Sequence, residues 1–198
     1  VKHLGGRVPA AEAAFLRYLI GIVFLLPIIR TLIQTRFERR DLGLCAVRGA
    51  VHSVGVMMGF FAMTQITLAE VTATGYLAPV FVTLGAAIFL GERLAIRRLL
   101  AVAAAIVGAF IILRPGFRVL EPGHYAMMLQ AVLVAGSCLI AKRMTGRYSP
   151  AIIVSMLSIM VTIGLAPFAA AVWVTPTLTE LGWLVVLACL ATGGHYTM

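Results

Sequence analysis

Acidic residues are scarce in this sequence, and charged residues of any kind are few. The 198 residues include 7 Asp and Glu against 16 Lys and Arg, 12% are charged, 62% are hydrophobic, and the mean hydropathy is +1.04. Soluble globular domains average about 25% charged and about 45 to 50% apolar residues. The composition therefore excludes an ordinary soluble domain and predicts an integral membrane protein.

Cysteines are also few. Cys45, Cys138 and Cys189 each lie inside an apolar run, and their spacing matches no metal-binding pattern. They predict neither a disulfide framework nor a zinc site, and no metal or cofactor is expected.

Pairs of catalytic groups are missing from the apolar runs. All seven acidic residues lie in connections or at the ends of runs, and no nucleophile stands beside a base within a run. An enzyme embedded in the membrane needs such groups, so the sequence does not predict an enzyme.

Basic residues are concentrated in three connections between apolar runs. Ten of the sixteen Lys and Arg lie in segments 30–41, 91–98 and 142–150, whereas the other connections together hold four. Membrane proteins keep connections rich in Lys and Arg in the cytoplasm, so these three are predicted to be cytoplasmic. The net charge of +9 is thus explained by membrane orientation, and nucleic acid is not an expected partner.

Apolar runs dominate the chain, and each is long enough to cross a bilayer as a helix, which takes about 20 residues. The predicted fold class is an all-α integral membrane protein, a polytopic helical bundle. The seven runs are 11–29, 42–64, 71–90, 96–113, 123–141, 151–174 and 178–198.

The third run carries a polar face. Thr72, Tyr76, Pro79 and Thr83 follow one another at intervals of four, three and four residues, which places them on one side of a helix. Pro79 lacks a backbone N–H and disturbs the carbonyl of Gly75, so the helix is expected to bend or open there. Such a polar stripe is expected to face a cavity rather than lipid.

A faint internal repeat links the two halves of the chain. Asp41-Leu42-Gly43 opens the second run, and Glu180-Leu181-Gly182 opens the seventh run 139 residues later. The two copies are five spans apart and so cross in opposite directions, as in the inverted repeats of secondary transporters. This register predicts inverted five-helix repeats truncated at both ends: residues 1–118 lack a first helix, and residues 119–198 lack the last two.

Several short motifs point to a known family. They are Phe15 to Tyr18, Leu44 to Gly49, Tyr76 to Phe81, Phe89 to Arg93, Gly108 to Gly116, and Gly193 to Tyr196. With these motifs the chain resembles the EamA-like members of the drug/metabolite transporter superfamily. The resemblance implies a ten-helix secondary transporter that moves a small organic metabolite or drug by alternating access around a midplane cavity. The expected location is a bacterial-type inner (plasma) membrane, which the protein crosses several times.

The resemblance does not fix the solute or the direction of transport. A small-molecule solute and the lipid bilayer are the expected partners, and a homodimer stays open. A channel or a non-transporting membrane scaffold is the alternative function. The inverted repeat favours a transporter, because a scaffold does not need one.

Candidate solute-binding residues lie near the middle of the runs. Tyr76 and Pro79, with Thr72 on the same face, are expected to line the cavity. His52 either lines the cavity or makes a hydrogen bond in helix packing. The remaining candidates are Gln130 in the fifth run and His195 and Tyr196 in the seventh.

Three arginines and one glutamate need separate interpretations. Arg17, two turns inside the first run, either extends to the outer interface or serves as a gating or anion contact. Arg48 is expected to extend its side chain to the cytoplasmic interface. Glu92 and Arg93 are interpreted as structural charges at the rim, where Glu92 pairs with a neighbouring arginine.

Proton coupling, if the transporter uses it, is expected to run through one of two histidines. No acidic residue lies at mid-depth, whereas His52 and His195 do. An imidazole changes its charge near neutral pH, which a coupling group requires.

Overall fold

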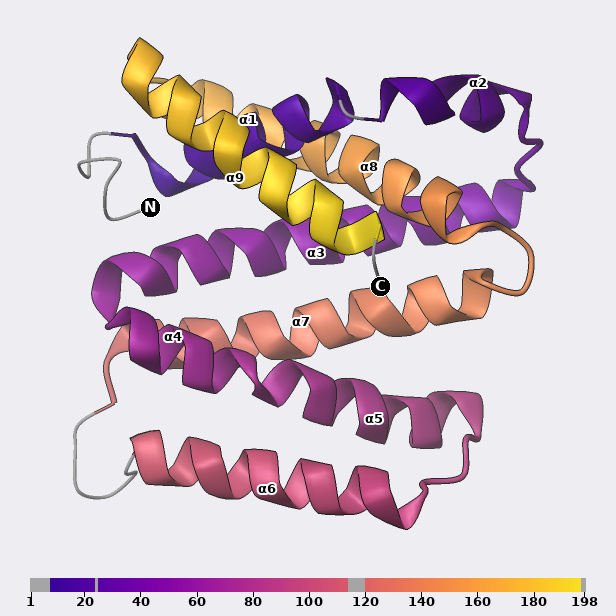
Figure 1. Cartoon of the computed structure of the whole chain (residues 1–198), viewed down its shortest axis with the longest axis vertical. Coiled ribbons are helices and arrows are strands. Elements are labelled where there is room, and N and C mark those ends of the chain that lie inside the picture. Colours follow the sequence, from indigo (N-terminus) through magenta and orange to yellow (C-terminus); the bar gives the residue numbers. More distant parts are fainter. Residues whose placement is uncertain (1–7, 24, 114–119, 197–198) are drawn as a thin grey trace. The chain divides into compact units, whose positions relative to one another are not determined.

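The computed structural model describes residues 8–23, 25–113 and 120–196, and within these ranges the chain is helical with no strand (Figure 1). This confirms the all-α fold class. The helices are α1 (Ala10–Val23), α2 (Leu26–Gln34), α3 (Arg39–Gln65), α4 (Leu68–Gly75), α5 (Leu77–Leu90), α6 (Ile96–Leu113), α7 (Pro122–Met144), α8 (Pro150–Ala171) and α9 (Leu178–Tyr196).

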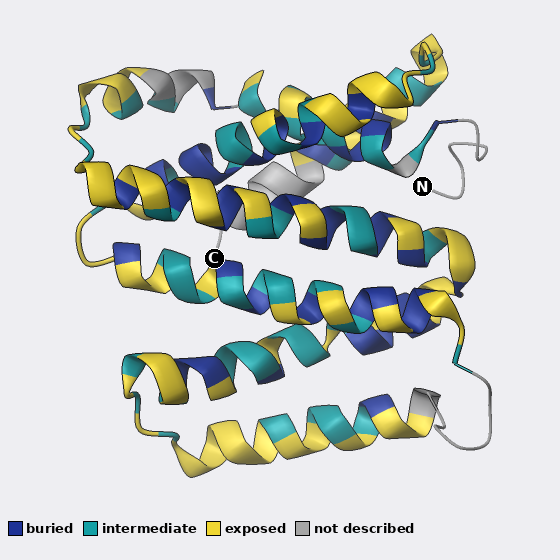
Figure 2. Cartoon of the chain, turned by 180° about the vertical axis from the view of Figure 1, so that it is seen from behind, coloured by how far each residue is buried: buried dark blue, intermediate teal, exposed yellow. Residues whose placement is uncertain are grey.

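Among the described residues, four segments are long and apolar enough to cross a membrane: α3, α4 with α5, α7 and α8. Large apolar side chains are exposed along the helices, such as Ile88 (74%) and Phe89 (79%) on α5. Exposed positions recur along the described helices (Figure 2). Lipid is the environment in which such faces are stable, so the structure confirms a multi-pass membrane protein.

The first predicted run, 11–29, differs from the expectation of one continuous spanning helix. It divides into α1, of 14 residues, and α2, of 9 residues. Pro27 lies in the first turn of α2, where a missing N–H costs no hydrogen bond. Within a continuous helix, the same proline would have left a carbonyl without its usual donor.

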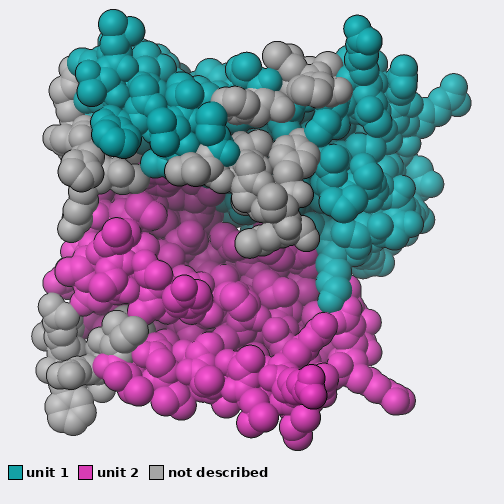
Figure 3. All heavy atoms as spheres, in the orientation of Figure 1, with its two compact units in different colours: residues 1–53, 141–198 teal, residues 54–140 magenta. Residues whose placement is uncertain are grey.

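The helices group into two compact units, drawn in different colours in Figure 3: unit 1 comprises residues 1–53 and 141–198, and unit 2 comprises residues 54–140. These units are defined by contacts within the fold, whereas the predicted repeats 1–118 and 119–198 are defined by sequence. The division into repeats stays a prediction.

Unit 1 is built around α8, which packs against α1 and α2. Val161 and Leu165 of α8 are fully buried. The first part of α3 approaches α8 closely, because a side chain on Gly49 would collide with Met160 and one on Gly164 would lie 2.6 Å from Ser53 Oγ. Small residues at these positions therefore bring the two helices together.

Unit 2 is built from the second part of α3 and from α4 to α7. Gly55 and Gly59 of α3, four residues apart, face α7: a Cβ on Gly59 would lie 2.6 Å from Gln130 Oε1, and one on Gly55 would lie 3.4 Å from Leu133 Cβ. Glycines at this spacing allow the close contact between the two helices. The buried core beside it contains Ala62, Ile66, Val71, Ala126 and Met127.

Candidate solute-binding site

The third predicted run is interrupted at Tyr76. Helix α4 begins with a capping box between Thr67 and Glu70 and ends at Gly75, and α5 starts at Leu77. Pro79, near the start of α5, cannot donate a hydrogen bond to the Gly75 carbonyl. At the place where Pro79 predicts a bend, the structure thus has a one-residue interruption between α4 and α5, with Tyr76 itself in a right-handed helical conformation.

The polar stripe along this broken helix is not covered by the helices of its own unit. Thr72 and Pro79 are exposed, and Tyr76 is 64% exposed. The Thr72 hydroxyl donates to the Leu68 carbonyl, and the Thr83 hydroxyl donates to the Pro79 carbonyl, each at 2.8 Å. Their donors are used within the helix, but their oxygens can still accept a hydrogen bond from a solute.

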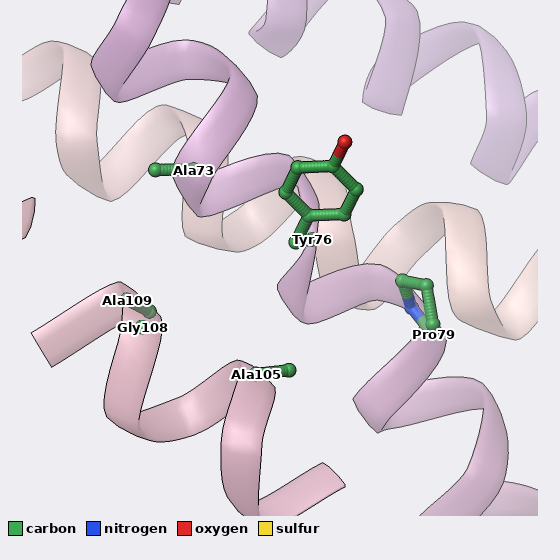
Figure 4. A pocket seen from close by; sticks show the side chains of 6 residues that line it. All are labelled: Ala73, Tyr76, Pro79, Ala105, Gly108 and Ala109. Atoms are coloured by element: carbon green, nitrogen blue, oxygen red, sulfur yellow. The ribbon is translucent and has the colours of Figure 1, made fainter. Parts of the chain in front are cut away.

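An apolar pocket lies beside the break, between it and α6 (Figure 4). Its volume is about 320 Å³. The Tyr76 hydroxyl points away from α6, so the carbon atoms of the tyrosine form part of the wall (Figure 4). Such a pocket suits an apolar group of a solute. The lining residues are Ala73, Tyr76, Pro79, Ala105, Gly108 and Ala109.

A second group of candidate residues meets in unit 1. A hydrogen bond of 3.0 Å joins Tyr18 Oη of α1 and His52 Nε2 of α3. The Arg17 guanidinium carbon lies 4.1 Å from the centre of the Tyr18 ring. The structure thus gives His52 a hydrogen-bonding partner, as one of its two interpretations requires, and adds Tyr18, which was not among the predicted site residues.

The prediction for Arg48 is wrong. Its side chain does not extend to the interface but is 7% exposed and donates from Nη1 to the Ile153 carbonyl of α8 at 2.9 Å. The reason is the close approach of α3 and α8 at the neighbouring Gly49, which encloses the side chain. Arg48 therefore joins two helices within unit 1.

The candidates in α7 and α9 are placed differently. Gln130 lies against Gly59 of α3, and its Oε1 is buried without a hydrogen-bond partner among the described residues. Gln130 thus faces the contact between α3 and α7. His195 and Tyr196 belong to the last turn of α9, but their side chains lie outside the described part of the structure.

The charges at the rim form a short-range cluster. Arg98 Nη1 lies 3.5 Å from Glu92 Oε2, so the predicted pairing of Glu92 with a nearby arginine is present, while Arg93 is exposed. Gly91 before them has φ +67°, a left-handed conformation that favours glycine and ends α5.

A buried polar pair in unit 2 was not identified from the sequence. His124 Nε2 lies 3.7 Å from Glu70 Oε1, and both side chains are at least nine-tenths buried. The Glu121 backbone N–H donates to His124 Nδ1 at 3.1 Å, and Glu70 Oε2 accepts from Thr67. The Thr67-x-x-Glu70 capping pattern was a readable signal, but nothing local in the sequence pairs Glu70 with His124.

Another polar cluster joins two basic connections of unit 1. Arg147 Nη1 lies 3.2 Å from both Glu38 Oε2 and Asp41 Oδ2, and the Tyr148 hydroxyl donates to Asp41 at 2.8 Å. These hydrogen bonds with Asp41 raise the pKa of Arg147 and of Tyr148. Segments 30–41 and 142–150, both predicted to be cytoplasmic, therefore lie at the same end of unit 1.

Comparison of the amino-acid sequence with known proteins identifies the family of the chain. Residues 1–114 match the EamA-like transporter family. The chain belongs to this family. It is similar to a pseudopaline exporter of Pseudomonas aeruginosa, with 30% identity over 98% of the chain and 69% of the relative.

Two further relatives of this EamA-like protein show how varied the solutes are. A riboflavin transporter of Brucella anthropi is 29% identical over 87% of the chain and 59% of its own length. An S-adenosylmethionine uptake transporter of Rickettsia bellii is 28% identical over 94% of the chain and 64% of its own length. The chain spans about three fifths to two thirds of the lengths of these relatives. Its family and its relatives identify the protein as a small-molecule transporter.

Proposed function

We propose that this EamA-like protein is a secondary transporter that moves a small organic metabolite or drug by alternating access past the α4–α5 break. The observation that supports this most is the exposed stripe of Thr72, Tyr76 and Pro79 at an interrupted helix. Secondary transporters commonly place solute sites at interrupted helices near the membrane midplane.

Two features would act together at the break. The pocket between the break and α6 would hold an apolar part of the solute, and the hydroxyl of Tyr76, which points out of that wall, would bond to a polar part. The break itself lets α4 and α5 change direction independently, which alternating access needs.

The charge distribution and the family support a proposal for the membrane and for the orientation of the protein in it. We place the protein in a bacterial-type inner membrane, with segments 30–41, 91–98 and 142–150 in the cytoplasm. The predicted repeats 1–118 and 119–198 would supply the two inverted halves. Since the relatives include both an exporter and an uptake transporter, the direction of transport is not part of the proposal.

The test is solute flux in proteoliposomes, with riboflavin and S-adenosylmethionine as the first solutes. We expect Tyr76→Ala to lower the initial rate at least about 10-fold, which corresponds to about 1.4 kcal/mol. The matched control is Ile88→Ala, on the same run but with an exposed apolar side chain, and it should keep the parent rate. Equal rates for the parent and Tyr76→Ala would contradict the proposed site.

A further inference from the structure

We propose that Arg17, Tyr18 and His52 form an anion-binding subsite that takes a carboxylate or phosphate group of the solute. This inference rests on the proposed transport function and names the solute's chemical class. The class is an organic anion or zwitterion with an oxyanion group that one guanidinium can bind.

The Arg17 guanidinium has no counter-ion among the described residues. It makes no ion pair with any residue that the structure describes, and its recorded contact is with the face of the Tyr18 ring. The acidic residue of its own helix, Glu12, is fully buried and accepts from the Val174 backbone N–H at 2.9 Å. Through Tyr18, Arg17 lies beside His52 in the middle of the spanning helix α3. A guanidinium at such a depth is costly unless it meets an anion or water, so such residues mark solute pathways.

The neighbouring contacts hold the guanidinium in place for a ligand. Tyr18 supplies the ring surface under Arg17, and its hydrogen bond to His52 fixes the ring between α1 and α3. A guanidinium above an aromatic face keeps its N–H groups free to donate in its own plane. Two of these N–H groups can donate hydrogen bonds to two oxygens of one carboxylate or phosphate group.

The depth of the group favours a solute over a lipid headgroup. His52 is the central residue of the 27-residue α3 (Arg39–Gln65). At about 1.5 Å per residue, it lies about 20 Å from either end of that helix. Lipid phosphates lie outside the hydrocarbon core, which is about 30 Å thick, so the Tyr18 hydroxyl is near the midplane and far from both headgroup layers. All three side chains are half-buried, which leaves them accessible to a ligand within the fold.

The experiment is binding of matched anionic and neutral probes to the full chain in phosphatidylcholine nanodiscs, measured by calorimetry. The pairs are riboflavin 5′-phosphate with riboflavin, and benzoate with benzamide. We expect at least one anionic probe to bind about 10-fold tighter than its neutral partner. Arg17→Gln should abolish this preference, Arg17→Lys should keep part of it, and Tyr18→Phe should weaken it. Arg30→Gln, at an exposed arginine of α2, is the matched control and should keep it.

Three results would overturn the subsite: no binding of either anionic probe, equal affinity for anionic and neutral probes, or a preference that survives in Arg17→Gln. A second set of nanodiscs with phosphatidylglycerol separates the two sources of an anion. If only that lipid stabilises the protein in an Arg17-dependent way, the ligand is a headgroup and the assignment to the solute is wrong. Arg17-dependent binding without flux would support the subsite and contradict the transport function. Flux of riboflavin 5′-phosphate that stays unchanged in Arg17→Gln would support the transport function and contradict the subsite.

Discussion

Buried polar side chains form contacts between helix ends in both units. In unit 1, Asp41 at the start of α3 accepts a hydrogen bond from Tyr148. In unit 2, His124 stands between the Glu70 carboxylate and the Glu121 backbone N–H. Because Nδ1 accepts from Glu121, the proton of a neutral imidazole is on Nε2, facing Glu70. This arrangement joins the starts of α4 and α7.

Replacing His124 tests how much these contacts contribute to the stability of the protein. We expect His124→Ala to lower the free energy of unfolding by about 1 to 3 kcal/mol, because it removes the acceptor of the Glu121 N–H and the imidazole beside a buried carboxylate. The measurement is denaturant-induced unfolding of the purified protein in detergent. Tyr125→Ala, an exposed neighbour on the same helix, should change stability little, and a similar loss in both variants would contradict the assignment.

The hydrogen bond from Tyr148 to Asp41 predicts a dependence on pH. It raises the pKa of Tyr148 above the usual value of about 10. A pKa raised on folding stabilises the protein below the unfolded pKa, and this contribution is lost as pH rises through the folded pKa. Tyr148→Phe should therefore be less stable than the parent from pH 7 to 9, and the difference should shrink above pH about 10. A difference that stayed constant up to pH 11 would be inconsistent with this hydrogen bond.

Local sequence patterns predicted some of these residues and not others. The pairing of Glu92 was predictable because Arg98 is six residues away. The burial of Arg48 was not, because its partner Ile153 is 105 residues further along the chain. The same holds for Glu70 and His124, where only the tertiary contact between α4 and α7 shows the pair.

Three prolines occupy different places in the helical elements of this chain. Pro79 lies in the first turn of α5, just after the break, and Pro27 lies in the first turn of α2. Pro167 lies inside α8, which continues through it. The sequence predicted the bend at Pro79 because a proline within a run lacks the N–H that the Gly75 carbonyl needs. It did not predict the division of 11–29, because Pro27 lies near the end of that run.

The break at Pro79 should matter for transport more than for folding. Pro79→Ala supplies a backbone N–H for the Gly75 carbonyl and favours one continuous helix, so stability should stay equal or rise. Flux in proteoliposomes should fall at least about 5-fold, about 1 kcal/mol, because α4 and α5 can no longer move separately. Pro167→Ala is the matched proline control and should leave flux unchanged. Full activity in Pro79→Ala would show that the break has no role in transport.

At the scale of the whole molecule, polar contacts join connections that are predicted to lie on the same side of the membrane. Arg147 meets Glu38 and Asp41 at the predicted cytoplasmic end of unit 1. His124 meets Glu70 at the predicted outer end of unit 2. The contacts inside each unit therefore join segments that the charge count assigns to the same side, and the orientation itself stays a prediction.

Cysteine labelling tests this orientation directly. In a background without Cys45, Cys138 and Cys189, single cysteines at positions 36, 97 and 147 should resist an impermeant thiol reagent in intact cells and react after lysis. A cysteine at Glu121, in a predicted outer connection, should react in intact cells and serves as the positive control. Reaction of all three cytoplasmic positions in intact cells would reverse the topology.

The central claim is that the Thr72, Tyr76 and Pro79 stripe faces each side of the membrane in turn. The most direct measurement uses the single-cysteine variant Tyr76→Cys and an impermeant thiol reagent, applied from outside to intact cells and from inside to inverted vesicles. Alternating access predicts reaction from both sides, slowed on both sides by a transported solute, while Ile88→Cys shows no effect of solute. Reaction from one side alone, or rates that a transported solute leaves unchanged, would contradict the claim.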